Sequence, residues 1–281
     1  MHTSARHAFD VLRLVCASDE PLGVTEISRR LSAPVSTTHR ALTTLERTSY
    51  VRRTESAKYE IGFNARRLAT GLLMRFLIRE TAQPFLRQIA VATDGATSLY
   101  VRLGWFGIRI ASIFSESDTI SKLEPLGEPH LLHQSIGSRA ILTVLPTGGQ
   151  RAYRSFVSLH YPHLWDDSAG EIVAAQGRDM RRSGYLYAHN PPTFDVLAVP
   201  VRDPDARAIA AITVQRMKPG RTPLTSEPQL TQCMDVVSRL ESVVRSKFDA
   251  LRDPYAHIDP DTIRLDVKST QRDATVALAE A

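Results

Sequence analysis

Residues 34–47, PVSTTHRALTTLER, place many hydrogen-bonding side chains on one short segment. Ser36, Thr37, Thr38, His39 and Arg40 follow one another with no carboxylate among them. Hydroxyl groups can bond to phosphate oxygens or base edges, and an arginine can form two hydrogen bonds with guanine. A carboxylate on such a surface would be repelled by phosphates. These residue types favour recognition of a nucleic acid over catalysis.

The apolar residues of this segment recur at helical spacing, so we expect a helix from about Ser36 to Arg47. Ser36 can cap its first amide groups, and the positive end of a helix favours a phosphate. The side that can pack on preceding helices consists of Thr38, Ala41, Leu42 and Leu45. The opposite side consists of Thr37, Arg40, Thr44 and Arg47, flanked by Ser36 and His39.

Two further helices and a hairpin are predicted around this segment. ARHAFDVLRLVCASDE and VTEISRRL each carry an apolar stripe, and Thr25 stands near the start of the second. YVRR and YEIG read as short strands joined by the polar turn TESAK. Two helices, a short turn and a hairpin are the order of a winged helix-turn-helix. Arg52, Arg53 and Lys58 flank the turn and suit contacts with the DNA backbone or minor groove.

The distribution of charge supports this reading. Residues 1–80 contain 13 Lys and Arg and 8 Asp and Glu, whereas the remaining residues contain 22 of each. Localised positive charge attracts polyanions at long range. For any single residue, the solvated face of an ordinary surface helix is the alternative. Taken as a set, the candidate DNA contacts are Thr25, Ser36, Thr37, Thr38, His39, Arg40, Thr44, Arg47, Arg52, Arg53 and Lys58.

Other chemistry has weak support in the sequence. His130 and His133, like His160 and His163, have a spacing that a metal site could use, but no cysteine is near them and prolines are. The sequence has no GxSxG, HExxH, Walker or GxGxxG motif. Its carboxylates form no evident pair in an apolar setting. We therefore expect no catalytic residues, no metal and no cofactor.

Composition indicates a globular protein of the cytoplasm. The 281 residues are 43% hydrophobic and 23% charged, and no apolar run approaches the ~20 residues of a membrane span. Asp10 and Arg13 interrupt any signal-peptide core. Cys16 and Cys233 stand far apart on apolar stripes, which favours two buried thiols in a reducing compartment over a disulfide.

The rest of the chain predicts a second domain. Residues 64–92 have helical spacing, with Pro84 expected to open a fresh helix. The apolar stripe on residues 68–77 is a candidate dimer seam or part of the domain's own core. From residue 96, strands and helices come in groups, which suggests an α+β domain with an antiparallel sheet. We expect DNA binding in residues 1–63, linker helices in 64–92, a sensor domain in 93–252 and a loosely ordered tail in 253–281.

The run PVSTTHRAL resembles the recognition helix of the IclR-type bacterial regulators at Pro34, Ser36, Thr37, His39 and Arg40. EISRRL and RRTESAKYEIG are similar to the preceding helix and the wing of that family. LLHQSIGSRAILTVLP and LAVPVRDPDARAIAAITVQ are similar to its effector-pocket segment and final strands. The resemblance covers about residues 5–250. It departs at Ser32, where glycine is usual, and at Val35, Thr38 and Arg139.

The resemblance implies a GAF-like sensor domain that holds a small organic acid or aromatic metabolite. Independently, Gly137 and Ser138 precede a predicted helix, and the unpaired amide groups at its start would suit a carboxylate. Thr213 and Gln215 share one side of a strand, which without the resemblance would read as solvated sheet surface. Arg139 could add charge or face water. The candidate effector contacts are Ser135, Ile136, Gly137, Ser138, Asn190, Val196, Thr213 and Gln215, with His133 a further candidate at the pocket mouth.

These features predict a ligand-responsive transcription regulator, either repressor or activator. Its expected partners are double-stranded DNA, a small-molecule effector and further copies of itself as a dimer or tetramer, and no membrane. One recognition helix covers few bases, so a near-palindromic operator is expected. The alternatives are a metal- or redox-sensing regulator and a metabolic enzyme with a fortuitous helix-turn-helix.

Overall fold

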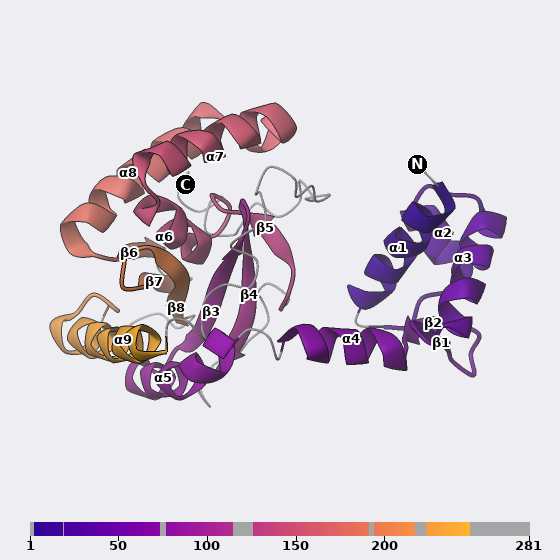
Figure 1. The fold of residues 1–281 in the computed structure, drawn as a ribbon, viewed down its shortest axis with the longest axis horizontal. Helices are drawn as coiled ribbons and strands as arrows, with labels where there is room; N and C mark the ends of the chain where they lie inside the picture. The colour runs from indigo at the N-terminus through magenta and orange to yellow at the C-terminus, as the bar shows by residue number, and fades with distance from the viewer. Residues whose placement is uncertain are drawn as a thin grey trace. The chain divides into compact units, whose positions relative to one another are not determined.

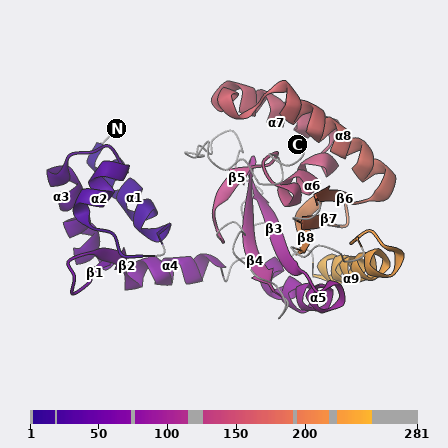
Figure 2. The same cartoon turned by 180° about the vertical axis from the view of Figure 1, so that it is seen from behind.

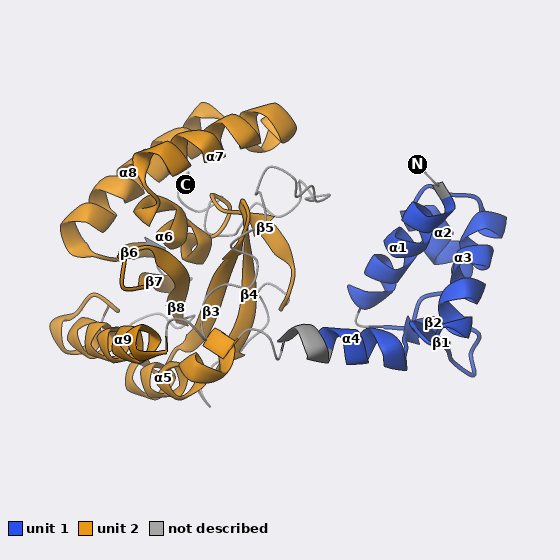
Figure 3. Cartoon of the chain, viewed as in Figure 1, with its two compact units in different colours: residues 1–75 blue, residues 76–281 orange. Residues whose placement is uncertain are grey.

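The structure, a computed structural model, describes residues 3–18, 20–73, 77–114, 126–190, 194–216 and 223–247. The chain forms two compact units, residues 1–75 and residues 76–281 (Figure 3). The predicted tail, residues 253–281, lies outside the described residues, as do the side chains of Leu72, Leu73 and Phe76 from the predicted apolar stripe.

The first unit is a winged helix-turn-helix, as the sequence predicted. Its elements are α1 (Thr3–Cys16), α2 (Val24–Arg30), α3 (Val35–Arg47), β1 (Val51–Arg53), β2 (Tyr59–Ile61) and α4 (Phe63–Leu73). Their apolar stripes meet in one core that includes Val11, Val15, Ile27, Leu42 and Tyr59. The side-chain amide of Asn64 donates to the carbonyl of Thr48 at 2.9 Å, which fixes the start of α4 against the end of α3.

The turn between α2 and α3 shows why glycine is usual at position 32 in the family that the sequence resembles. Ser32 has φ +50°, in the left-handed region. A side chain there costs about 1–2 kcal/mol relative to the right-handed conformation, which glycine avoids. Glycine is therefore the natural residue at this position, and the chain carries serine in a strained conformation.

The second unit is built on a six-stranded sheet with the order β5-β4-β3-β8-β7-β6. Every neighbouring pair is antiparallel, which confirms the predicted α+β class. The strands are β3 (Ala96–Leu103), β4 (Phe106–Ile113), β5 (Pro129–Leu131), β6 (Leu186–Asn190), β7 (Phe194–Arg202) and β8 (Ala208–Arg216).

Helices cover both faces of this sheet (Figures 1 and 2). They are α5 (Leu77–Thr93), α6 (Ile136–Val144), α7 (Thr147–His160), the 3-10 helix η1 (Pro162–Leu164), α8 (Asp167–Ser183) and α9 (Glu227–Ser246). On one face, α5 and α9 pack against Leu99, Leu197 and Ile212. On the other face, α6 packs against Tyr100, Val196 and other residues, and we call this the α6 face.

Glycine ends α8, because Gly184 has φ +82° and caps the helix. The prediction that Pro84 opens a new helix is wrong, because Pro84 lies inside α5. The buried stripe Ile78, Ala82, Leu86 and Ile89 continues through the proline, so packing of that face outweighs the lost hydrogen bond.

A membrane span was not expected, and within the described ranges no helix combines the length and hydrophobicity that crossing a bilayer requires.

Candidate nucleic-acid interface and effector face

The outward side of α3 faces solvent, and only Thr37 among its predicted contacts is partly covered. Val11, Leu42 and other core residues hold the inward side. Ser36, His39, Arg40, Thr44 and Arg47 are exposed, and Thr37 is half-buried. A contiguous set of hydroxyl and guanidinium groups is therefore free to meet a duplex. Thr25, at the first turn of α2, is exposed as well.

Two details of α3 differ from the sequence reading. Thr38 is 0% exposed, and its hydroxyl lies 3.3 Å from Nε2 of His7 in α1, so it cannot touch DNA in this structure. Its position in the helical repeat places it on the packing side, as the spacing alone required. Ser36 does not cap the helix either, because α3 begins one residue earlier with Pro34 at the N-cap and no side-chain cap. Ser36 is exposed, and its hydroxyl is not used as the helix cap.

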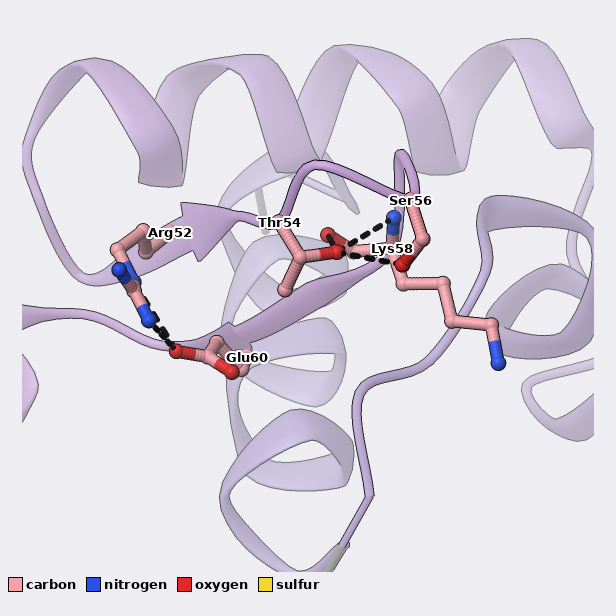
Figure 4. Close-up of polar contacts among 5 residues, drawn as sticks. All are labelled: Arg52, Thr54, Ser56, Lys58 and Glu60. Atoms are coloured by element: carbon pink, nitrogen blue, oxygen red, sulfur yellow. Dashed lines mark hydrogen bonds and ion pairs between the residues drawn. The ribbon is translucent and has the colours of Figure 1, made fainter.

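The turn of the wing is organised by Thr54. Its hydroxyl lies 3.0 Å from Oγ of Ser56 and accepts the backbone N–H of Lys58 at 3.2 Å (Figure 4). The backbone of Thr54 also donates to the carbonyl of Lys58 at 2.8 Å. This closed turn presents the Lys58 ammonium group to solvent, and Arg53 is exposed at the adjoining strand end.

Arg52 differs from Arg53 and Lys58, because it already has an anionic partner within the wing. Its Nε donates to Oε1 of Glu60 at 3.0 Å, and its NH2 group contacts the same oxygen (Figure 4). Arg52 and Glu60 face each other across the hairpin. The arginine side chain is 70% exposed, so the pair is a solvent-screened contact that a phosphate can compete with.

The α6 face brings together five of the predicted effector residues. Val196 stands opposite Gln215 in the sheet, and Thr213 lies on the same side of β8 two residues earlier. A Cβ atom on Gly137 would come within 2.6 Å of the Tyr100 ring and 2.9 Å of the Thr213 methyl group. Only glycine allows the start of α6 to sit this close to the sheet. The set so assembled is Ile136, Gly137, Val196, Thr213 and Gln215.

Ser135 and Ser138 belong to a buried polar cluster with His130. Nε2 of His130 lies 2.8 Å from Oγ of Ser135 and 2.7 Å from Oγ of Ser138. Ser135 is also the N-cap of α6, and its hydroxyl accepts the backbone N–H of Ser138 at 3.3 Å. That amide, which the sequence reading offered to a carboxylate, is therefore already paired. Gly107 lies beneath the cluster, where a Cβ atom would overlap Ser138.

Asn190 is the last residue of β6 and pairs with Phe194 across the hairpin. Its side chain lies outside the described residues.

His133 is buried and connects the segment before α6 to α7 and η1. Its Nδ1 lies 2.6 Å from the Tyr153 hydroxyl, and its Nε2 lies 2.7 Å from the carbonyl of Leu164. The Tyr153 hydroxyl accepts the backbone N–H of His133 at 3.0 Å. The hydroxyl therefore donates to Nδ1, and Nε2 donates to the carbonyl. Burial lowers the pKa of His133 to about 4, so the imidazole is neutral at pH 7.

Arg139 is buried rather than solvated. Its Nε donates to Oε1 of Gln176 at 2.8 Å, and its NH1 donates to the carbonyl of His133 at 2.8 Å. It ties α6 to α8 and to the loop before α6. Arg139 therefore does not face water, as one of the two alternatives had it, but connects elements inside the second unit.

The metal and redox alternatives gain no support from the described residues. Within them, no group of three or more His, Cys, Asp or Glu residues is arranged to hold a metal. Cys16 and Cys233 are free thiols, as predicted, and Cys233 is buried, but the predicted burial of Cys16 is wrong, because its residue is exposed near the end of α1. Burial raises the pKa of Cys16, and it raises the pKa of Cys233 to about 11, so Cys233 stays protonated and poorly nucleophilic at pH 7.

A cavity of about 490 Å³ lies between α7 and α8. Arg151, Arg154, Asp166 and Glu171 are among its lining residues. It contains none of the predicted effector residues.

Sequence reasoning missed Arg109, Tyr100 and the hydroxyl groups of Ser98 and Ser112 on the α6 face. Tyr100 stands opposite Arg109, and Ser98 stands opposite Ser112. The signal available in the sequence was a single arginine between Ile108 and Ile110 in the strand FGIRIASI. From sequence alone, a charged residue in an apolar strand is predicted to face solvent, unless both faces of the sheet are known to be covered.

Comparison with protein families gives one match in the first unit. The model for the IclR helix-turn-helix domain matches residues 4–55, which include α1, α2, α3 and the first strand of the wing. A curated protein from Cupriavidus necator, named "Probable transcriptional regulator SauR", is 26% identical over 217 residues. That alignment covers 76% of this chain and 86% of the relative.

Solved structures share the fold of both units. The IclR protein of Thermotoga maritima has a TM-score of 0.65 at 20% identity, covering 88% of this chain and 99% of its own. An IclR homolog from Microbacterium hydrocarbonoxydans, crystallised with 4-hydroxybenzoate, has a TM-score of 0.68 at 19% identity, covering 89% and 99%. The first unit therefore matches the IclR helix-turn-helix domain over residues 4–55, the chain is similar to a probable transcriptional regulator, and its fold is that of the solved IclR structures.

Proposed function

We propose that this chain is a transcriptional regulator of the IclR family that binds a near-palindromic operator as a homo-oligomer and senses a small organic acid or aromatic metabolite on the α6 face. The observation that carries the DNA-binding part is the exposed outward side of α3 with Ser36, Arg40 and Thr44. Two-fold pairing would double the bases read and predicts half-sites about one helical turn apart, or a multiple. With this function, the protein works in the cytoplasm, where the DNA is.

Exposed apolar side chains in the first unit support self-association. Phe63 is 72% exposed and Leu68 is 54% exposed, both on α4. Large apolar side chains at such exposure favour a partner surface. The predicted stripe on residues 68–77 includes Leu68, which makes α4 the proposed seam between two copies. Sedimentation of the full chain, with and without Leu68→Glu, tests this seam, and an unchanged oligomer in L68E would remove α4 from it.

The effector part rests on the placement of the predicted residues and on one relative. Ile136, Gly137, Val196 and Thr213 share the α6 face. The Microbacterium hydrocarbonoxydans homolog was crystallised with 4-hydroxybenzoate, an aromatic acid. A small acid bound by the native state raises the melting temperature by mass action. A thermal-shift screen of organic acids on the full chain tests the assignment. The assignment would be contradicted if none of the acids raised the melting temperature.

Arg40→Ala should weaken specific DNA binding by about 1–3 kcal/mol, because Arg40 is exposed at the centre of the outward side of α3 and can bond two groups of a guanine. Fluorescence anisotropy with a selected operator and a scrambled duplex measures the loss. The matched control is Arg29→Ala, which removes an exposed arginine of α2 outside the candidate contacts. Equal affinity of wild type and R40A for the operator would exclude Arg40 from base reading.

Arg53→Ala should weaken binding to every duplex and lower the slope of log K against log salt by about 1, because Arg53 is exposed and suits a phosphate. Arg52→Ala should have a smaller effect, because Glu60 already neutralises Arg52. Glu60→Gln frees Arg52 and should tighten binding and steepen the salt slope. In the E60Q background, Arg52→Ala should then cost as much as Arg53→Ala. Equal effects of Arg52→Ala in both backgrounds would show that the pair does not limit Arg52.

A further inference from the structure

Arg109 is a buried cation without an anionic partner among the described residues. It lies in β4 and is 3% exposed. Its NH1 donates to the hydroxyl of Ser112 at 2.9 Å. Its Nε is buried and has no hydrogen-bond partner in the described part of the chain. An arginine does not lose its proton in proteins, so Arg109 carries a full positive charge in this position.

Arg216 shows what a compensated arginine looks like in the same sheet. Its Nε and NH2 donate to the two carboxylate oxygens of Asp195 at 3.2 and 2.8 Å. Arg216 and Asp195 are also both buried, and Asp195 accepts the backbone N–H of Leu224 at 3.0 Å. A buried ion that lacks such a partner is costly to the folded state. Among the described residues, the hydrogen-bond acceptor of Arg109 is the neutral hydroxyl of Ser112. An anion bound beside Arg109 would therefore stabilise its charge, and the described residues do not supply one.

The register of the sheet places Arg109 on the α6 face. Arg109 stands directly opposite Tyr100, and Ser112 stands directly opposite Ser98. Ser98 in turn stands opposite Thr213. Side chains of directly paired residues share one face of a sheet. Tyr100 packs with α6, and the Cβ position of Gly137 reaches both Tyr100 and Thr213. Arg109 therefore belongs to the same face as the predicted effector contacts.

We propose that Arg109 binds the carboxylate of the effector. This rests on the proposed function, in which a small molecule is sensed on the α6 face. The guanidinium Nε and a terminal nitrogen form the fork that accepts two carboxylate oxygens. The hydroxyl groups of Ser98 and Ser112, which lie 2.9 Å apart, border this fork. Ile136, Val196 and Ala198 supply apolar surface for the body of the ligand. The effector class is a small monocarboxylate with an apolar body.

The test compares acids with their uncharged amides on the full chain at constant ionic strength. The probes are acetate, benzoate and 4-hydroxybenzoate against acetamide, benzamide and 4-hydroxybenzamide. We expect at least one acid to raise the melting temperature of the wild type while its amide does not. In Arg109→Met, the apparent affinity for that acid should fall at least tenfold. Arg207→Met is the matched control, because Arg207 is an exposed arginine in the same unit, and its response should equal the wild type.

A purely structural role for Arg109 predicts different results. R109M would then melt lower without ligand and keep the wild-type acid shift, which would overturn the proposal. Our assignment predicts that R109M without ligand is at least as stable as the wild type, because an uncompensated charge is removed. Arg109→Lys is the second variant, which keeps the charge but loses the planar fork, and it should bind the acid more weakly than the wild type.

The remaining outcomes separate this proposal from the proposed function. No shift of the wild type by any acid of the panel would overturn the proposal. A probe that stabilises wild type and R109M equally would retain effector sensing and reject Arg109 as the anchor. Absence of DNA binding at low salt by the wild type would reject the operator function and leave the Arg109 result standing.

Discussion

Asp195→Ala should destabilise the second unit by about 3–5 kcal/mol, the cost of leaving a buried arginine without its partner. Arg216 and Asp195 make two hydrogen bonds across β7 and β8, and their side chains are 3% and 9% exposed. The carboxylate also fixes Leu224 just before α9. Asp195→Ala therefore leaves the buried Arg216 without its carboxylate partner, and it also removes the hydrogen bond that holds Leu224 just before α9.

Urea unfolding followed by tryptophan fluorescence measures this loss, because both tryptophans, Trp105 and Trp165, lie in the second unit. The matched control is Asp205→Ala, whose partner Arg207 lies 3.9 Å away in an exposed pair. An exposed pair of this kind contributes about 0–1 kcal/mol. The double variant Asp195→Leu, Arg216→Met should recover much of the stability, since neither member of the pair then leaves a buried charge without its partner. A loss in D195A no larger than in D205A would refute the buried-pair assignment.

The first unit could be predicted almost completely because its determinants are local. Val11, Val15, Ile27 and Leu42 recur at helical spacing, and each helix is too short to bury its stripe alone. The observed arrangement buries all the stripes and leaves the outward side of α3 polar. Prediction failed at single positions. Thr38 was included because of its neighbours in sequence, although the helical repeat directs it to the core.

The candidate effector face could be predicted only in part, because it is formed by residues distant in the chain. Thr213 meets Gly137 and Tyr100 only after β3 pairs with β8. The alternation in β8 was visible, but nothing local says which side α6 covers. Arg109 is the clearest case. Its burial depends on strands and a helix up to about 100 residues away, so its sequence neighbours gave no sign of it.

His133→Gln should remove a loss of stability that the wild type suffers in acid, and this is the second large effect. Burial lowers the pKa of His133 from its ordinary 6.5 to about 4. Between these values, the unfolded chain binds a proton that the folded chain excludes, so unfolding becomes more favourable as pH falls through this range. The wild type should therefore lose about 2 kcal/mol between pH 7.5 and pH 5 through this residue.

The geometry around His133 explains why the folded state excludes the proton. Nδ1 accepts from the Tyr153 hydroxyl, and Nε2 already donates to the carbonyl of Leu164. A second proton would turn Nδ1 into a donor facing that hydroxyl proton, inside a pocket that also holds the positive Arg139. Urea unfolding by tryptophan fluorescence at pH 7.5 and pH 5 measures the difference, which should shrink by about 2 kcal/mol in H133Q.

His163→Gln is the matched control, because it removes an exposed imidazole from η1, next to the Leu164 carbonyl that His133 binds. The same pH dependence in H133Q and the wild type would show that His133 is not the group responsible. His133 connects the segment before α6 to η1 and α7, so protonation of its imidazole should loosen the start of α6, which carries Gly137 and Ser138. Acid should therefore weaken effector binding before the second unit unfolds, and H133Q should lose less affinity than the wild type, because protonation of the effector's own carboxylate acts on both proteins.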